Sequence, residues 1–204
     1  MAQTTTLHLV RHGEVYNPLR QYYGRLPGFR LSENGLAQAR VTAHKLGQHS
    51  NSIAAVFSSP MERTTETATE ILKQLNGQTL QISELLNEVY SPFDGQPIAV
   101  LVERNWDLYS GTQPPFEQPA DILGRAKAFI AQVRKEYAGG DVVAVTHGDF
   151  VAAVMLWSLG QPMTPEHKKP LYRDYIGHAS VTSFTFHSES DDEVPKFRYF
   201  EPPQ

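Results

Sequence analysis

The chain has 204 residues, of which 40% are hydrophobic and 20% are charged, a balance that predicts one globular domain spanning 1–204 and excludes a disordered or fibrous protein. The formal net charge is -4 at pH 7 and the basic residues are dispersed, which argues against binding to nucleic acid or to an anionic membrane. Cysteine is absent, which excludes disulfides and a thiolate nucleophile, and no apolar run has the length of a membrane span or the pattern of a signal peptide, so we expect a cytoplasmic protein.

Short apolar strands and amphipathic helices alternate in the first part of the chain. The apolar run Thr5–Val10 predicts a buried strand that ends abruptly at the pair Arg11–His12. Ser32 is a suitable N-cap for the next helix. Ile53–Phe57 predicts a second strand, and Ser59–Glu62 offers an N-cap, a proline for the first helical position and a glutamate three residues after the cap. We therefore expect a second helix to begin there.

The middle of the chain changes character twice. Leu80–Leu86 predicts a third strand that leads to Glu88. Prolines and aromatic residues then crowd the segment 89–119, which predicts a lid-like insertion with a short helix at 98–108. Apolar residues at helical spacing over Ile122–Tyr137 predict a longer helix after the insertion.

The last part of the chain completes an α/β pattern. The nearly all-apolar strand Val142–Thr146 ends at His147, and a helix is expected at 150–159. Segments 180–186 and 196–200 predict a final pair of strands. Alternating short strands and helices indicate a three-layer α/β sandwich, with a mostly parallel sheet and helices on both of its faces.

Basic side chains follow three separate predicted strands. Arg11 and His12 follow the first strand, Arg63 follows the second, and His147 follows the fourth. The ligand crevice of an open α/β sheet lies at the carboxyl ends of its strands, so we expect these side chains to meet. One guanidinium group can donate two parallel hydrogen bonds to the oxygens of a phosphate. The backbone N–H groups at a helix N-terminus, such as those after Gly148, add the positive end of the helix dipole. The pattern predicts a pocket for a compact dianion.

The same residues suggest covalent chemistry. A neutral His12 imidazole that faces a bound phosphate can accept the phosphoryl group in line with the departing alcohol. Protonated His147, together with Arg11 and Arg63, would neutralise charge on the equatorial oxygens, so neither a metal nor another cofactor is required. Glu88 lies beside the expected anion, which raises its pKa, and it is the candidate proton donor to the leaving group.

Several short motifs surround these residues, in the chain order Arg11-His12-Gly13-Glu14, Ser58-Ser59-Pro60 with Arg63, Glu66-Thr67-Ala68, Glu88 and Val145-Thr146-His147-Gly148. Together they resemble the histidine phosphatase superfamily, the phosphoglycerate-mutase-like family, over the whole chain. The resemblance implies a phosphoglycerate-mutase-like fold and a phosphatase-type member. It also implies phosphorylation of His12, a phosphate pocket made by Arg11, Arg63 and His147, and Glu88 as the proton donor.

Asn17, Arg25 and Gly148 are further candidates for substrate contact. Members of the family often carry an asparagine four residues after the motif glutamate, whereas this chain has Pro18 there and Asn17 one position earlier. His178 begins a segment that resembles the family's final strand and could approach the crevice, with a structural role favoured. A set of basic residues keeps an acidic substrate possible: Arg20, Arg25, Arg30, Lys168, Lys169 and Arg173.

We expect hydrolysis of a small phosphorylated metabolite, with a homodimer as a candidate assembly. One alternative is a 2,3-bisphosphoglycerate-dependent phosphoglycerate mutase. It is disfavoured because the segment 89–119 holds a single basic residue, Arg104, where the mutases of the family carry paired arginines. Another alternative is a non-catalytic phosphate-binding or scaffold domain, which the loss of the nucleophile or of the acid would indicate. Both His12 and Glu88 are present.

Overall fold

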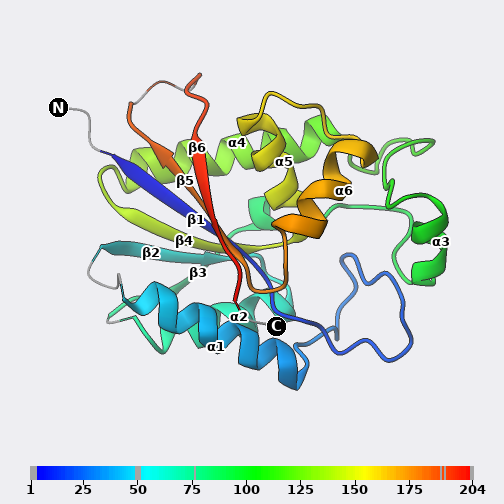
Figure 1. The fold of residues 1–204 in the computed structure, drawn as a ribbon, viewed down its shortest axis with the longest axis horizontal. Coiled ribbons are helices and arrows are strands. Elements are labelled where there is room, and N and C mark those ends of the chain that lie inside the picture. The colour runs from blue at the N-terminus through cyan, green and yellow to red at the C-terminus, as the bar shows by residue number, and fades with distance from the viewer. Residues whose placement is uncertain (1–3, 49–51, 76, 189, 191, 203–204) are drawn as a thin grey trace.

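Six strands form one mixed sheet through the middle of the molecule (Figure 1). The computed structural model describes residues 4–48, 52–75, 77–188, 190 and 192–202. In the order β3-β2-β4-β1-β5-β6, the first four strands are parallel, β5 runs antiparallel to β1, and β6 runs antiparallel to β5. The strands are β1 (Thr5–Arg11), β2 (Ile53–Ser58), β3 (Leu80–Ile82), β4 (Asp141–Thr146), β5 (Val181–Phe186) and β6 (Lys196–Phe200).

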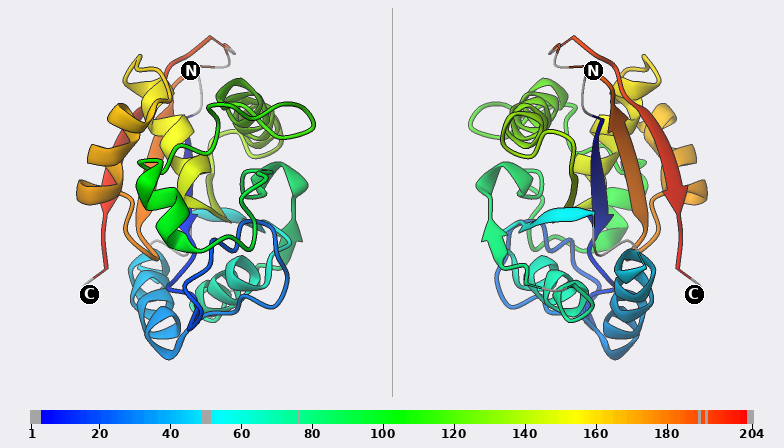
Figure 2. Two further views of the ribbon diagram at one scale, coloured as in Figure 1. Left: turned by 90° about the vertical axis from the view of Figure 1, so that its right-hand side faces the viewer. Right: turned by 90° about the vertical axis from the view of Figure 1, so that its left-hand side faces the viewer.

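Helices cover both faces of the sheet, as the two side views show (Figure 2). They are α1 (Glu33–Gly47), α2 (Glu62–Leu72), α3 (Ile98–Glu103), α4 (Pro119–Glu136), α5 (Gly148–Ser158) and α6 (Pro165–Asp174). α1 and α2 pack on one face of the sheet, α4 and α5 pack on the other, and α6 lies against α5. The predicted three-layer α/β fold is confirmed. In the described part of the chain, no helix is both long and apolar enough to cross a membrane.

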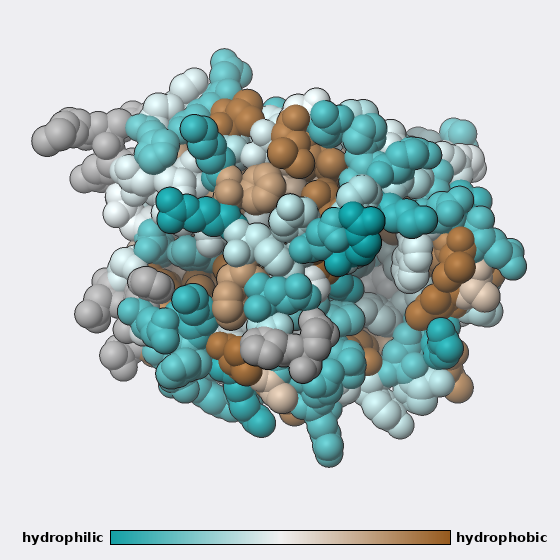
Figure 3. Space-filling view, viewed as in Figure 1, coloured by the Kyte–Doolittle hydropathy of each residue, from teal (hydrophilic) through white to brown (hydrophobic). Residues whose placement is uncertain are grey.

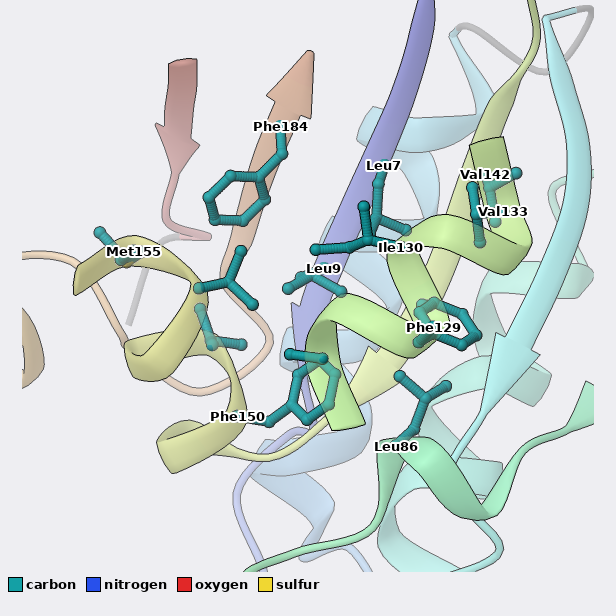
Figure 4. Close-up of a cluster of buried hydrophobic side chains, with 14 of the residues drawn as sticks. Leu7, Leu9, Leu86, Phe129, Ile130, Val133, Val142, Phe150, Met155 and Phe184 are labelled. Carbon is teal, nitrogen blue, oxygen red and sulfur yellow. The ribbon is translucent and has the colours of Figure 1, made fainter. Parts of the chain in front are cut away.

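The larger hydrophobic core lies between the sheet and the layer of α4 and α5 (Figure 4). Leu7 and Leu9 of β1 pack there with Phe129 and Ile130 of α4 and with Phe150 of α5, and all five side chains are buried. Complete burial of one such side chain contributes about 1.5 to 3 kcal/mol. A second core joins the opposite face of the sheet to α1 and α2. Because β1 contributes to both cores, packing fixes the end of this strand from two sides.

The predicted start of the second helix is wrong by two residues. α2 begins at Glu62, its N-cap is Met61, and no side chain caps it. Ser59 cannot begin the helix because its N–H still donates to the carbonyl of Val145 in β4 at 3.0 Å. Its hydroxyl is buried and donates to Asn87 Oδ1 at 3.1 Å. The cap predicted for α1 is confirmed, since the hydroxyl of Ser32 accepts from the Gly35 N–H at 3.0 Å.

The third strand is shorter than predicted. β3 ends at Ile82, and a 3-10 turn, η1 (Glu84–Leu86), replaces the rest of the expected strand. The side-chain amide of Asn87 donates to the Glu84 carboxylate at 2.6 Å and stabilises this turn. The turn places Leu86 in the core and brings Glu88 to the edge of the sheet.

Two helices outside the main layers also differ from expectation. α3 ends at Glu103, well before the predicted 108, because Asn105 and Trp106 adopt positive φ angles of 52° and 58°, which no right-handed helix accommodates. α6 was not predicted at all, because Pro170 lies inside it and interrupts the pattern of a continuous helix.

The segment 89–119 has a small hydrophobic core of its own. Leu101, Leu108 and Tyr109 from the segment pack with Ile122 of α4 and Ala153 of α5. These contacts hold the segment against the helices beside the carboxyl edge of the sheet, and α3 and α6 lie at this same end of the molecule (Figure 1).

The loop after β1 passes the start of α1 at backbone contact distance. A Cβ atom on Gly13 would lie 2.5 Å from the carbonyl oxygen of Gly35, and a Cβ on Gly35 would lie still closer to the carbonyl oxygen of Glu14. There is no room for a side chain on either glycine. These two glycines therefore allow the loop after β1 to approach α1 closely. His12 lies between the end of β1 and this contact.

We expect Gly35→Ala to destabilise the protein by about 1 to 3 kcal/mol, because the added methyl group overlaps backbone atoms that a side-chain rotation cannot move away. Urea unfolding measures the difference. Gly124→Ala in α4 is the matched control, since nothing lies within 4 Å of a Cβ there and alanine favours a helix. Equal stability of the two variants would contradict the close approach.

Candidate active site

The strand ends bring the predicted basic residues together at one edge of the sheet. Arg11 and His12 follow β1, His147 follows β4, and Arg63 lies in the first turn of α2 beyond β2. The backbone N–H of His12 donates to the carbonyl of Thr146 at 3.0 Å. The ring centroids of His12 and His147 are 5.4 Å apart. The four side chains lie at one edge of the sheet, as predicted, because the parallel strands that precede them end there.

His12 is held in one tautomer. Its Nδ1 lies 2.8 Å from the carbonyl oxygen of Gly13, and because a carbonyl can only accept, Nδ1 carries the proton and Nε2 carries a lone pair. The side chain is 1% exposed. Burial, and after it the charges of Arg63 and Arg11, lower the pKa of His12 well below its usual value. The site therefore contains a neutral imidazole, with a nucleophilic nitrogen, between two guanidinium groups.

Arg11 and Arg63 keep part of their hydrogen-bonding capacity unused. Arg11 donates to the carbonyl of Ile176 at 2.7 Å, and Arg63 donates to the carbonyl of Gly24 at 2.7 Å. The Nε atoms of both arginines are buried and have no hydrogen-bond partner in the described structure. A buried donor without a partner is costly, so these two arginines favour a ligand that carries negative charge.

His147 belongs to a chain of polar contacts. Arg63 Nη2 lies 3.2 Å from His147 Nδ1, His147 Nε2 lies 3.0 Å from the Ser59 hydroxyl, and that hydroxyl donates to Asn87. This order leaves the proton of the ring on Nε2. Burial, followed by the charges of Arg63 and His12, lowers the pKa of His147 well below its usual value. His147 is thus neutral in the structure, whereas the sequence analysis considered a protonated ring.

Glu88 is buried beside His147. One carboxyl oxygen accepts from the Val89 N–H at 2.9 Å, and the other lies 3.6 Å from His147 Nδ1. Burial, and after it the negative charge of Asp149, raises the pKa of Glu88 to about 7. The predicted direction is confirmed, but the main cause is burial and not a bound anion. A carboxyl group with this pKa can donate and accept a proton near neutral pH.

The secondary candidates have different surroundings. Asn17 and Gly148 line the cavity above His12. The Asn17 side chain also braces its own loop, donating to the Gln21 carbonyl at 2.7 Å and accepting from the Gln21 N–H at 3.1 Å. Arg25 is not among the residues that line the cavity, because its guanidinium donates to the Glu88 carbonyl and to Glu117. In the structure it supports the backbone of Glu88.

His178 lines the cavity beside Arg11. Its Nε2 lies 3.2 Å from Arg11 Nη2, and its ring centroid lies 6.1 Å from that of His12. Burial, and after it the charge of Arg11, lowers the pKa of His178 to about 3. His178 is therefore neutral, and its Nε2 accepts a hydrogen bond that orients Arg11.

A buried cluster around Asp149 was missed by the sequence analysis. Asp149 accepts from the Tyr109 hydroxyl and the Lys168 ammonium at 2.6 and 2.8 Å through one oxygen, and from the Tyr172 hydroxyl at 2.6 Å through the other. Although burial opposes its ionisation, Lys168 and the hydroxyl donors hold the pKa of Asp149 below its usual value. The cluster joins α5, α6 and the 89–119 segment. Only the position of Asp149 after the strand end signals it in the sequence.

The site opens into a cavity of about 720 Å³, which Arg11, His12 and Glu88 line. Within the described residues, no three His, Asp or Glu side chains lie close enough together to hold a metal ion. The cavity is within the size range of sites for small organic molecules.

We expect Asp149→Asn to lower the free energy of unfolding by about 3 to 5 kcal/mol, because it leaves the Lys168 ammonium buried without a counter-charge. Asp174→Asn, which breaks an exposed pair with Arg173, is the control and should leave stability nearly unchanged. Thermal and urea unfolding provide the comparison. A loss no larger than that of the control would show that Asp149 does not hold the cluster.

A sheet edge that gathers arginines around a neutral histidine defines an α/β enzyme for compact anionic groups. Comparison with known proteins specifies which one. The model of the histidine phosphatase superfamily (branch 1) matches residues 7–194, and the chain therefore belongs to this superfamily. The resemblance noted in the sequence is confirmed.

Relatives extend over most of the chain. It is 35% identical over 193 residues to an uncharacterized protein of Mycobacterium tuberculosis, which covers 91% of this chain and 92% of that protein. It is 30% identical over 150 residues to phosphoserine phosphatase 1 of Hydrogenobacter thermophilus, covering 69% and 70% of the two chains. The structure of a mycobacterial glucosyl-3-phosphoglycerate phosphatase superposes with a TM-score of 0.77 at 25% identity, covering 98% of each chain. The predicted enzyme class, a phosphatase, is thus confirmed.

Proposed function

We propose that the protein hydrolyses a small phosphorylated metabolite through a phosphohistidine at His12, without a metal ion. The observation that supports this most directly is the fixed neutral tautomer of His12, whose Nε2 is free of the Gly13 contact and whose ring is under the charges of Arg63 and Arg11. The two guanidinium groups supply the charge that a metal ion would otherwise provide to the phosphate oxygens.

In the first step, the lone pair of His12 Nε2 forms a bond to phosphorus while the bond from phosphorus to the ester oxygen breaks. Glu88, protonated near neutral pH, transfers its proton to the departing oxygen and the alcohol leaves. Arg11, Arg63 and His147 would stabilise the three equatorial oxygens, and the binding of the dianion favours a protonated His147.

In the second step, the Glu88 carboxylate removes a proton from water, whose oxygen attacks phosphorus. The bond between phosphorus and His12 breaks, and inorganic phosphate and neutral His12 result. The same carboxyl group thus acts first as an acid and then as a base. Its pKa of about 7 suits both roles at neutral pH.

The mutase alternative has weaker support. Arg104, the single basic residue of the segment 89–119, donates to the carbonyls of Asp107 and Ser110 and lies over the ring of Phe93. It does not line the cavity. The insertion thus contributes no basic side chain to substrate binding, whereas a mutase needs to retain its phosphorylated intermediate for a second transfer. The expected homodimer and the cytoplasmic location stay predictions.

We expect turnover of an aryl phosphate to be unchanged by chelator and to fall by on the order of 10³-fold or more in His12→Ala, because the nucleophile is lost. The exposed His44 provides a control, His44→Ala. A phosphoenzyme that is stable in base and labile in acid should form in the wild type and be absent from His12→Ala. Chelator-sensitive turnover, or activity that survives the His12 change, would overturn the mechanism. An assay primed with 2,3-bisphosphoglycerate tests the mutase, and absence of any turnover would favour the scaffold alternative.

The pH profile of kcat/KM tests Glu88. Because Glu88 is protonated below its pKa of about 7 while His12 stays neutral over the same range, activity should be high below pH 7 and decline as Glu88 loses its proton. Glu88→Gln should remove this decline and lower kcat/KM by about 10²- to 10⁴-fold. The loss should be greater for alkyl than for aryl phosphates, since alkoxides leave poorly without a proton. Glu136→Gln on α4 is the control, and wild-type turnover of alkyl phosphates by Glu88→Gln would remove Glu88 from the mechanism.

A further inference from the structure

The cavity is much larger than the group that reacts in it. His12 and Arg11 line the end where phosphate would bind, and the cavity has about 720 Å³ in total. A phosphoryl group has only four heavy atoms, so most of this volume is available to the rest of the substrate. Sites of 300 to about 1,000 Å³ typically enclose molecules of drug size. The size alone disfavours a three-carbon phosphoester as the best substrate.

One wall of the cavity is apolar and exposed. Ile98 and Val102 lie one helical turn apart on α3, and Trp106 follows them, and all three line the cavity. Val102 is 56% exposed and Trp106 is 46% exposed. In the space-filling view, apolar surface gathers over α3 beside the hollow that separates α3 from α6 (Figure 3). Exposed apolar side chains that gather at a cavity indicate a ligand surface.

Hydrogen bonds hold Trp106 in this wall in an unfavourable backbone conformation. Trp106 has a φ of 58°, a conformation that large side chains rarely adopt. Its N–H donates to the Leu101 carbonyl at 2.7 Å, and its carbonyl accepts from the buried ammonium of Lys168 at 3.2 Å. Because Lys168 is itself bound to Asp149, the buried cluster fixes the backbone of Trp106 at the cavity.

The opposite wall carries positive charge. Lys169 and Arg173 lie four residues apart on α6, line the cavity and are exposed. Arg173 pairs only with its exposed neighbour Asp174, and no ion pair with Lys169 occurs within the described residues. Glu14 also lines the cavity, but its carboxylate already accepts from Ser32 and Asn34. Two cations are thus available to an anionic group at this wall.

The geometry points to a phosphomonoester whose leaving group has a flat apolar body against Ile98, Val102 and Trp106 and a carboxylate facing Lys169 and Arg173. Recognition of the phosphoryl end rests on the proposed function. The apolar body and the carboxylate are recognised by residues of α3, α6 and Trp106, none of which takes part in the proposed chemistry. Ile98, Val102, Trp106, Lys169 and Arg173 are therefore specificity-determining residues.

Three aryl phosphates separate these contributions: 6-carboxy-2-naphthyl phosphate, its 6-carboxamide and phenyl phosphate. We expect kcat/KM to be about 10- to 100-fold higher for the naphthyl carboxamide than for phenyl phosphate, because the second ring is removed from water. The carboxylate should add a further factor of about two to five, which declines with salt because the cations are exposed. Equal kcat/KM for all three compounds would overturn the inference and leave the proposed function intact.

Matched variants locate the effect. Val102→Ala and Trp106→Ala should reduce the preference for naphthyl over phenyl, whereas Val41→Ala, on the exposed side of α1, should not. Lys169→Gln should reduce the preference for carboxylate over carboxamide, and Lys169→Gln combined with Arg173→Gln should abolish it, whereas Lys135→Gln on α4 should retain it. Because each readout is a ratio of two substrates on one variant, a loss of folded protein cancels. Ratios that change equally in a variant and its control would contradict the assignment of these residues.

A binding measurement keeps the test independent of turnover. The corresponding phosphonates, in which CH₂ replaces the ester oxygen, are titrated into His12→Ala by calorimetry. The same order of affinities would support the cavity assignment even if no phosphate ester were hydrolysed. In that case the proposed function would be contradicted, while the assignment of the cavity would stand. Equal affinities of the three phosphonates would overturn the inference.

Discussion

The buried guanidinium of Arg63 is the interaction on which the site depends. Burial is the main cause of the lowered pKa values of His12 and His147, and the charge of Arg63 is the second cause for both. Burial also lowers the pKa of Arg63 itself. The Arg63 guanidinium lies 4.7 Å from the centre of the Tyr23 ring and donates to the Gly24 carbonyl. The charges of Arg63 and Arg11 act together on His12, and a dianion, as the proposed function requires, would offset them. Under the proposed function, phosphate binding and the protonation of His147 would therefore be coupled.

The fold provides this arrangement by simple means. Parallel strands end at one edge of the sheet, and β1 is packed between two hydrophobic cores, so Arg11 and His12 follow a fixed strand. The contact of Gly13 with Gly35 then fixes the loop, and the Gly13 carbonyl selects the tautomer of His12. The residues that react are thus positioned chiefly by backbone atoms.

The sequence identified the features that depend on local pattern. Two apolar runs end directly at a basic pair or residue, Arg11–His12 and His147, and Arg63 follows the second run at the start of the next helix, which is why these residues were found together with the α/β fold. Features that depend on distant contacts were not visible. Nothing near Ser59 indicates that its hydroxyl meets His147 and Asn87 and is unavailable as a cap. Lys168 is separated from Asp149 by 19 positions, and the helix that carries it contains a proline.

The ammonium of Lys168 contacts both the Asp149 carboxylate and the Trp106 carbonyl, and this has a consequence for how such a protein diversifies. The two walls of the cavity belong to segments far apart in the sequence, yet one buried cation is shared between them. A change that replaces Lys168, or that moves the backbone of Trp106, leaves a buried acceptor or the buried ammonium without its partner. Movements of the backbone in either wall should therefore require compensating substitutions in α6 and in the segment before α4, whereas a side-chain substitution such as Val102→Ala leaves the shared cation and its two acceptors in place.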